Sequence, residues 1–157
     1  MNLPPMKHSQ QGMALLVSLV FLLLLTLIGL SSMQSATLQE KMTSSVMQRN
    51  QSFQIAEAAL RVGESAVQVE AYSLPVCTTT IQCAPPAESA TLTVAGRNST
   101  SGVTWVATAG GFYGVQNIGT TQDAVKLNTL PVTLYRVTAV AVVGNNQRSV
   151  VESIYAK

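Results

Sequence analysis

The first third of the chain holds one long, strongly apolar run. Residues 12–32 read GMALLVSLVFLLLLTLIGLSS, and between positions 13 and 30 only a serine, a threonine and a glycine interrupt the apolar side chains. A helix of about 18 to 20 such residues is long enough to cross a bilayer. The run therefore predicts a membrane-spanning helix.

The apolar pattern then continues with helical spacing. Small or apolar residues recur three, four or seven positions apart, at Leu38, Met42, Val46, Phe53, Ala56, Leu60, Gly63 and Val67. No proline occurs between Leu15 and Tyr72. This pattern predicts a single helix from Met13 to about Glu70, apolar on all sides in its first third and amphipathic in its last third.

After the helix the pattern changes to turns and short strands. Residues 73–90 contain three prolines and both cysteines, which predicts a loop leaving the helix. Alternating apolar residues predict strands at 91–95 and 103–107, joined by a turn at 96–102. The glycine-rich stretch 110–119 lacks a phosphate-loop ending, so we interpret it as an irregular surface loop. Its aromatic pair, Phe112 and Tyr113, either packs locally or contacts a partner.

The strongest strand signal lies near the C-terminus. Alternation over Thr133–Val143 and a returning segment Gln147–Tyr155, around the turn 144–146, predict a β-hairpin. Its apolar face is expected to cover the stripe on the helix. The expected fold class is α+β, with one long N-terminal helix packed on a C-terminal antiparallel sheet. Residues 73–157 would form the loop and the β-sheet head.

The residues before the apolar run predict its orientation. Lys7 and His8 precede it without any acidic residue, which favours a cytoplasmic N-terminus and an outward-facing remainder. A cleavable secretory signal has a shorter apolar core of about 7–15 residues. The stretch SMQSA after the run is also a poor cleavage site, because Gln34 would stand at the −3 position if cleavage followed Ala36. An ordinary signal peptide is therefore disfavoured.

A short hydrophilic leader ending in glycine, followed at once by such a helix, resembles the type IV prepilins. Three stretches are most similar to minor pilins of the PilX type: QQGMALLVSLVFLLLLTLIGL, SFQIAEAALRVGE and YRVTAVAVVGNNQRSVVESIYAK. The resemblance covers about the first 70 residues well and about the last 25 moderately. It implies a pilin fold, with a leader at 1–12, a membrane and filament-core segment at 13–32 and an amphipathic half at 33–72.

The resemblance also implies processing and a position in the filament. A prepilin peptidase would cut after Gly12, and Met13 would become the N-methylated first residue. Most pilins have glutamate at the fifth mature position, where this chain has Val17. In the family that glutamate is thought to neutralise the amino terminus of a neighbouring subunit. A subunit with no neighbour above it has no use for the charge, so Val17 implies a place at or near the tip.

The implied function is that of a minor pilin that primes a type IV pilus used in twitching motility and adhesion. Implied partners are other minor pilins, the major pilin, a tip adhesin, prepilin peptidase and the inner-membrane assembly platform. The chain would reside in the bacterial inner membrane before assembly and in the extracellular pilus afterwards. Two alternatives are a type II secretion pseudopilin and a single-span, membrane-anchored periplasmic binding module. Gly29 with Ser31 and Ser32 marks either membrane exit or a segment that bends on packing into a filament.

Composition and charge give little indication of a catalytic or nucleic-acid-binding function. Nine Lys and Arg against seven Asp and Glu give a dispersed net charge of +2, which argues against nucleic-acid binding. Cys77 and Cys83 predict a disulfide in an oxidising compartment, the alternative being two buried thiols. We expect no catalytic site, cofactor or metal, because the only histidine lies in the leader. The carboxylates after Glu70 are Glu88, Asp123 and Glu152 alone.

Overall fold

The structure, a computed structural model, describes residues 11–123, 131–144 and 146–157. It divides into two compact units, one ending at Ser44 and the other formed by Ser45–Lys157. Each unit is described by itself. Most of the leader predicted for residues 1–12 lies outside the described residues, as does Asn145 in the predicted hairpin turn.

The predicted long helix is present as α1, which runs from Gln11 to Gln68 and so ends two residues before the expected position. Gly29 and Gly63 both lie inside it without interrupting it. In the first unit, every described side chain from Met13 to Ser44 is exposed. This half of the helix therefore has no internal partner, whereas the half in the second unit does.

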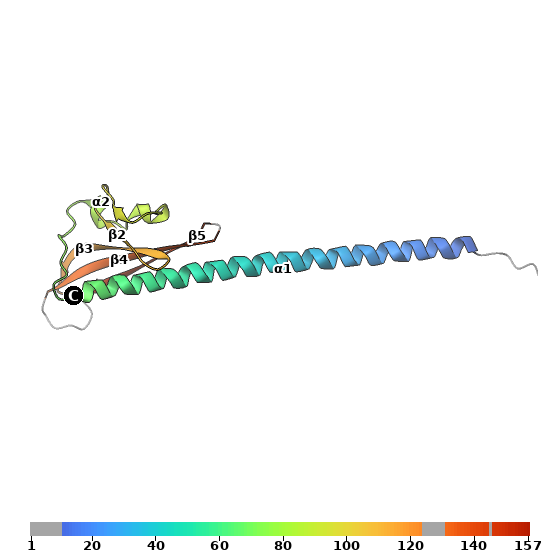
Figure 1. Ribbon diagram of the computed structural model, residues 1–157, viewed down its shortest axis with the longest axis horizontal. Coiled ribbons are helices and arrows are strands. Elements are labelled where there is room, and N and C mark those ends of the chain that lie inside the picture. Colours follow the sequence, from blue (N-terminus) through green and yellow to red (C-terminus); the bar gives the residue numbers. More distant parts are fainter. Residues whose placement is uncertain (1–10, 124–130, 145) are drawn as a thin grey trace, which may run out of the picture. The chain divides into compact units, whose positions relative to one another are not determined.

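The second unit contains a five-stranded sheet in which each strand pairs antiparallel with the next along the chain, in the order β1-β2-β3-β4-β5. The strands are β1 Gly96–Arg97, β2 Thr104–Ala107, β3 Gly111–Thr121, β4 Val132–Val143 and β5 Gln147–Ala156. A short helix α2, Thr80–Cys83, and a 3₁₀ turn η1, Ala87–Ala90, precede them. The last part of α1 lies on one face of the sheet and α2 on the other (Figure 1). The predicted α+β class is confirmed.

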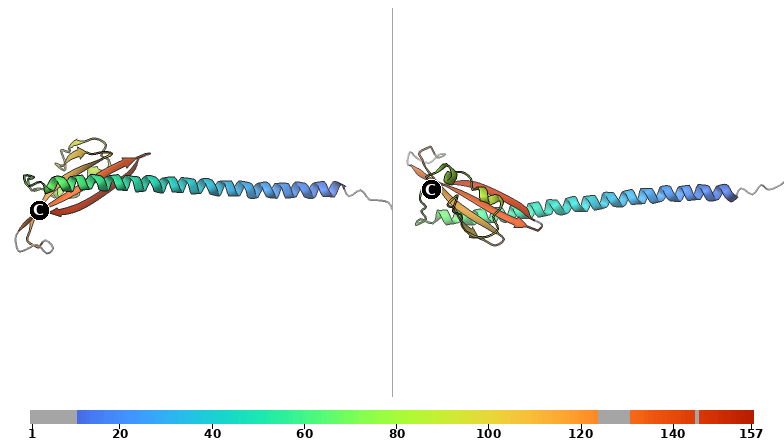
Figure 2. Two further views of the ribbon diagram at one scale, coloured as in Figure 1. Left: turned by 60° about the horizontal axis from the view of Figure 1, so that its bottom comes forward. Right: turned by 90° about the horizontal axis from the view of Figure 1, so that it is seen from above.

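Small side chains on α1 allow the helix to approach the sheet closely. The most buried positions recur three or four residues apart, at Ser52, Ala56, Ala59, Gly63 and Val67. A Cβ atom added at Gly63 would lie 2.6 Å from the Cγ1 atom of Val137 on β4. Both further views show the end of α1 running along the sheet (Figure 2). The contact depends on the absence of a side chain at this glycine.

The predicted apolar stripe of the helix, from Leu38 to Val67, is buried only in its C-terminal half. Ala56, Gly63 and Val67 are buried against the sheet, and Leu60 is partly buried in the same cluster. Its N-terminal members are exposed instead, at Leu38, Met42, Val46 and Phe53. Two of these exposed residues precede Ser45, and so they belong to the first unit. Periodicity identified an apolar face, but it does not specify which turns of that face the sheet covers.

Both faces of the sheet carry a core. On the helix side the buried cluster is formed by Val67, Val115, Tyr135 and Val137. On the opposite side it is formed by Val103, Trp105 and Val140, with Leu92 and Phe112 packed against it. The chain between α1 and β2 must therefore supply the cover for this second face.

The prediction of a surface loop at residues 110–119 is wrong, because this stretch forms most of the central strand β3. Its glycines allow close approach within the sheet. A Cβ atom at Gly114 would lie 2.5 Å from Val103 Cγ1, and one at Gly111 would lie 2.7 Å from the carbonyl oxygen of Val140. Gly119 has a φ of 115° and lies where the register with β4 shifts. The two aromatic residues of the stretch pack locally, one in each core cluster.

The strand predicted at 91–95 is also absent, since extended pairing begins only at β1. Leu92 instead covers the second core cluster without joining the sheet, whereas Val94 is exposed. Asn98 Oδ1 accepts hydrogen bonds from the backbone N–H groups of Thr100 and Ser101, at 2.8 and 3.0 Å, and shapes the following turn. The predicted loop at 73–90 contains α2, whose first turn is capped by the Thr79 side chain.

The C-terminal hairpin is confirmed. β4 and β5 pair without a register shift from Leu134↔Ala156 to Val143↔Gln147. Tyr135, Val137, Ala139 and Ala141 are buried on the helix side of β4, as the alternation predicts.

Candidate functional site

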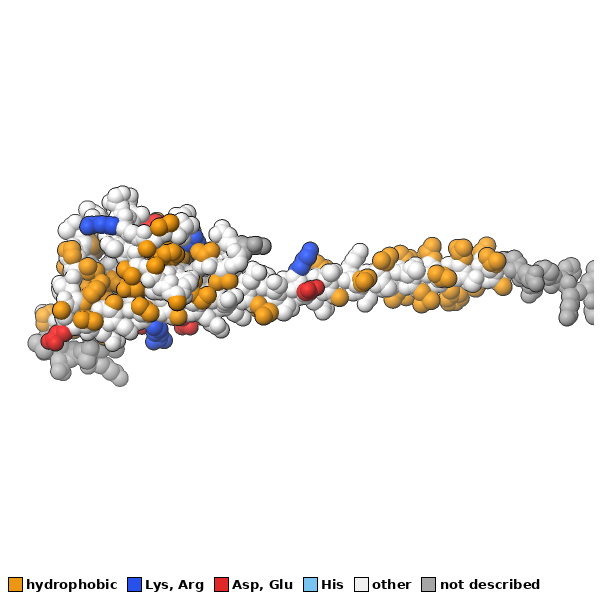
Figure 3. All heavy atoms as spheres, in the orientation of Figure 1, with side chains coloured by type: hydrophobic (Ala, Val, Ile, Leu, Met, Phe, Trp, Pro, Cys, Tyr) orange, Lys and Arg blue, Asp and Glu red, His pale blue; other side chains and the backbone are white. Residues whose placement is uncertain are grey.

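The apolar segment Met13–Leu30 of α1 is the main candidate site, because it exposes large apolar side chains on all sides. Phe21 is 63% exposed, Leu25 66% and Ile28 67%. Apolar side chains gather along this part of the helix in Figure 3. Leaving one such side chain in water costs about 1.5–3 kcal/mol relative to burial. The segment therefore requires an apolar environment, either lipid or other helices.

The few polar groups of this segment are satisfied within it. Ser18 Oγ donates to the carbonyl oxygen of Leu15, and Thr26 Oγ1 donates to that of Leu23, both at 2.8 Å. No charged residue occurs between Met13 and Gln39. A lipid-exposed segment can span a bilayer only if its backbone polar groups bond internally, as those of a helix do. Among the described residues, α1 is the one helix long and apolar enough to span a membrane.

The residues singled out by the sequence lie along this helix. Gly12 is in its first turn, directly before Met13, which is 67% exposed. Val17 is 46% exposed on the next turn, so a different side chain there would meet the surroundings of the helix. A Cβ atom at Gly29 would meet nothing within 4 Å. The structure thus leaves Met13, Val17 and Gly29 free for external contacts.

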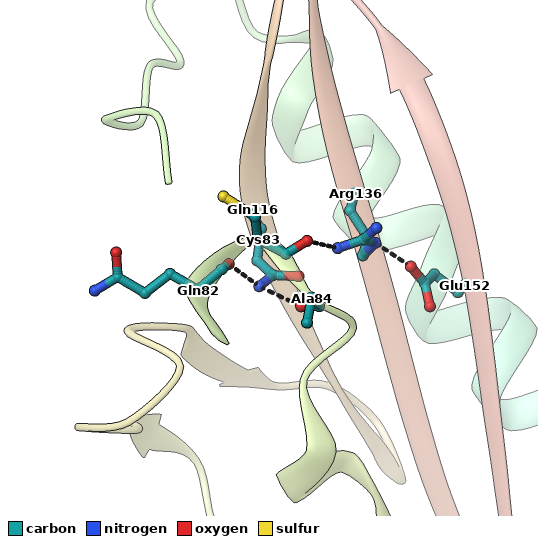
Figure 4. A network of polar contacts seen from close by, with 6 residues as sticks. All are labelled: Gln82, Cys83, Ala84, Gln116, Arg136 and Glu152. Atoms are coloured by element: carbon teal, nitrogen blue, oxygen red, sulfur yellow. Dashed lines mark hydrogen bonds and ion pairs between the residues drawn. The ribbon is translucent and has the colours of Figure 1, made fainter. Parts of the chain in front are cut away.

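A second feature is the loop closed by the disulfide between Cys77 and Cys83, whose Cα atoms are 5.3 Å apart. Three consecutive backbone carbonyl groups near its end face the sheet (Figure 4). Gln116 Nε2 on β3 donates to the carbonyl oxygens of Gln82 and Ala84, at 2.6 and 3.1 Å. The loop is thereby fixed to the sheet face opposite α1.

Arg136 on β4 extends this network to the last strand. Its Nη1 donates to the carbonyl oxygen of Cys83 at 2.6 Å, and its Nε forms an ion pair with Glu152 on β5 (Figure 4). The Arg136 side chain is only 15% exposed and that of Glu152 34%. The two charges neutralise each other in a partly buried setting. Sequence reasoning did not identify this network, because its partners are backbone carbonyl groups.

The end of α1 is surrounded by tyrosines and by the C-terminal lysine. Burial, with smaller contributions from Tyr113 and Tyr135, raises the pKa of Tyr72 to about 12. The rings of Tyr72 and Tyr135 pack edge to face with centroids 5.8 Å apart. Lys157 Nζ donates to the carbonyl oxygens of Val69, Glu70 and Tyr72, at 2.6–3.2 Å. A cation at this position is favourable, because the carbonyl groups of a helix end carry partial negative charge.

The remaining carboxylates do not form a common site. Glu88 accepts hydrogen bonds from Trp105 Nε1, at 3.2 Å, and from Ser101 Oγ. Glu152 is paired with Arg136, and Asp123 is exposed. Within residues 11–123, 131–144 and 146–157, no three His, Cys, Asp or Glu residues lie together as a potential metal-ligand set. Glu88 and Glu152 thus have local, structural partners.

Comparison with known families finds a similarity in the N-terminal part of the chain. Residues 11–61 match the family described as PilX N-terminal, a range that includes the whole apolar segment and most of the amphipathic part of α1. No curated protein and no solved structure matched the chain. Over residues 11–61 the chain is therefore PilX-like.

Proposed function

We propose that this PilX-like pilin chain is a minor pilin, which primes the assembly of a type IV pilus and is incorporated at or near its tip. One observation carries the proposal: the PilX N-terminal match coincides with an uncharged helical segment whose side chains are all exposed. The proposed role is structural and non-catalytic, with no cofactor or metal.

The mechanism is a transfer of the apolar segment between two apolar environments. Before assembly, residues 13–32 span the inner membrane, with the N-terminus in the cytoplasm and the head, residues 73–157, in the periplasm. During assembly the segment moves into a bundle of similar helices in the extracellular filament. Because Ser18 and Thr26 bond to their own helix, neither location leaves these two hydroxyl donors unsatisfied. Gly29 offers a point of close helix contact.

Processing is the first step of this pathway. Prepilin peptidase is proposed to remove residues 1–12 by cutting after Gly12, and Met13 is then N-methylated. The match to the family begins at residue 11, and so it includes the proposed cleavage position. Residues 33–72 then form the amphipathic half of the helix that carries the head.

The tip position rests on Val17. A carboxylate in hydrocarbon is costly unless it is paired, and in a shaft subunit its partner would be the amino terminus of the next chain. With valine at this position, the segment enters the membrane or the filament without the cost of a buried carboxylate. It also cannot pair with the amino terminus of a neighbouring chain. The proposed neighbours are other minor pilins, the major pilin and a tip adhesin, brought together on the inner-membrane assembly platform.

Deletion of the gene, with complementation by wild type and by Gly12→Val, tests the function. The deletion strain should lose surface pili and twitching, wild type should restore both, and the uncleavable variant should restore neither. Normal piliation and twitching in the deletion strain would reject a priming role. A defect in protein secretion with normal pili would instead indicate a type II secretion pseudopilin.

A further inference from the structure

The two edges of the sheet differ sharply in length. At one edge, β1 has two residues and begins with Gly96 at a φ of 143°. At the other edge, β5 has ten residues and pairs with β4 throughout without a register shift. Very short edge strands prevent unwanted pairing, whereas long regular ones present a row of unpaired backbone groups. The β5 edge is the one suited to accept another strand.

The hairpin register shows which backbone groups of β5 are available. Lys157 and Thr133 exchange both backbone hydrogen bonds, at 2.7 and 2.9 Å. Since backbone groups alternate in direction along a strand, every second residue before Lys157 faces β4. The residues in between direct their N–H and C=O groups outward: Arg148, Val150, Glu152, Ile154 and Ala156. Among the described residues, no strand pairs with this edge.

The usual protections of an exposed edge are missing from β5. Charged side chains normally block edge pairing, but both charges of this strand point to the chain's own groups. Arg148 Nη1 donates to the carbonyl oxygen of Ser89 at 3.0 Å, and Glu152 is paired with Arg136. The strand contains no proline. Val150 lies between these charges and Ile154 follows the second, and the two side chains are 44% and 52% exposed.

A groove beside the start of β5 adds charge selectivity. It has a volume of about 490 Å³ and lies between α1, at Arg49–Phe53, and residues 147–150 of β5. Phe53 supplies an apolar wall and is 47% exposed. The charged residues that line the groove are Arg49 and Arg148, and no described carboxylate does so. A bound segment with a carboxylate at this end of the strand would therefore be complementary in charge to the groove.

We propose that the β5 edge binds an extended segment of another protein by strand addition, with a carboxylate of that segment in the Arg49 groove. Backbone hydrogen bonds hold the added strand, and Val150 and Ile154 contact its apolar side chains. A second copy of this chain fits poorly. Centred antiparallel pairing of two β5 strands would place Glu152 of one chain directly opposite Glu152 of the other, and like charges in that position are unfavourable.

The test measures binding of labelled, capped heptapeptides of alternating valine and threonine to the full chain in detergent micelles, by fluorescence anisotropy. One peptide carries glutamate at the N-terminal end, one at the C-terminal end, and matched controls carry glutamine. One glutamate peptide should bind about fivefold more tightly than its glutamine control, as one partly exposed ion pair provides. Arg49→Gln should remove that difference. The outward amides of Val150 and Ile154 should become protected from hydrogen exchange on binding.

Two substitutions at one position separate backbone from side-chain effects. Ile154→Pro removes an outward N–H and should weaken binding about tenfold or more, because the added strand loses a hydrogen bond and meets the ring. Ile154→Thr keeps the N–H and should remain within about threefold of wild type. The buried Trp105, the single tryptophan of the chain, reports by fluorescence whether each variant is folded.

Three results would overturn the proposal. These are absence of binding at millimolar peptide, equal binding by folded Ile154→Pro and wild type, and a dimer of the chain that Ile154→Pro dissociates. The last result would assign the edge to a second copy.

Discussion

Replacing Gly63 with alanine would place a methyl group between α1 and the sheet. The added carbon would lie 2.6 Å from Val137 Cγ1 and 3.0 Å from the ring of Tyr113. Val137 is fully buried, so its side chain cannot turn out into solvent to make room. The helix would have to shift away from β4, or the side chains of the Val67 cluster would have to repack.

Two opposing effects determine whether Gly63→Ala raises or lowers the free energy of unfolding. Alanine favours the helix by about 1 kcal/mol over glycine. Overpacking a tight core by one methyl group costs about 1–3 kcal/mol. Because a fully buried valine forms the nearer contact, we expect the cost to exceed the gain by about 1 kcal/mol. For a unit of this size, that difference lowers the melting temperature by about 4 °C.

Thermal unfolding of the full chain in micelles, followed by Trp105 fluorescence, measures the effect. Trp105 is buried in the second unit, so its signal reports that unit alone. Gly29→Ala is the matched control, since a methyl group there meets nothing within 4 Å and should leave this transition unchanged. A higher melting temperature for Gly63→Ala would refute the packing argument. In a Val137→Ala background the same substitution should cost less, because the nearest obstructing methyl group is gone and only the Tyr113 contact remains.

Three further predictions concern the second unit. Replacing Cys77 and Cys83 with serine should lower the free energy of unfolding by about 2 kcal/mol, the value for closing so short a loop, and denaturant titration with no measurable loss would contradict this. Glu152→Gln should lower the free energy of unfolding by about 1–2 kcal/mol in the same titration, because it leaves the Arg136 charge partly buried without its partner. An unchanged denaturation midpoint would show that the ion pair contributes nothing. Burial raises the folded pKa of Tyr72 from 10 to about 12, so the unfolded chain loses this proton first. Its contribution to stability should be complete below pH 10 and decline as pH rises towards 12; a Tyr72→Phe variant with the same alkaline decline would contradict the assignment.

Local patterns were sufficient where they were long and uninterrupted. The helix from Gln11 to Gln68 follows from its spacing and the absence of proline, and its predicted ends are within two residues. The hairpin β4–β5 follows from alternation on both sides of a glycine and asparagine turn. In both cases many consecutive residues indicate the same type of secondary structure. Tertiary contacts therefore do not change the element that the local pattern predicts.

Strand β3 could not be predicted because the meaning of its glycines depends on distant residues. Gly111 and Gly114 allow a close approach only because Val140 and Val103 lie beside them in the folded sheet. In sequence, the same glycines are typical of a loop. Leu92 illustrates the converse case, since it alternates like a strand residue but packs as cover over a core.

The candidate site divides in the same way. The apolar segment is evident from hydropathy, because its chemistry is that of its own side chains. The contacts of Gln116 and Arg136 with backbone carbonyl groups depend on the path of the disulfide loop, which composition does not specify. The exposed edge of β5 depends on the strand order, so its open hydrogen-bonding groups become visible only in the folded sheet.

The N-terminal mass of the chain, purified from membranes and from sheared surface filaments, tests the central claim most directly. The account predicts a mature chain that begins at Met13 and carries one N-methyl group, present in both fractions. Retention of residues 1–12 on the mature protein, or cleavage farther along, for example after Ala36, would contradict it.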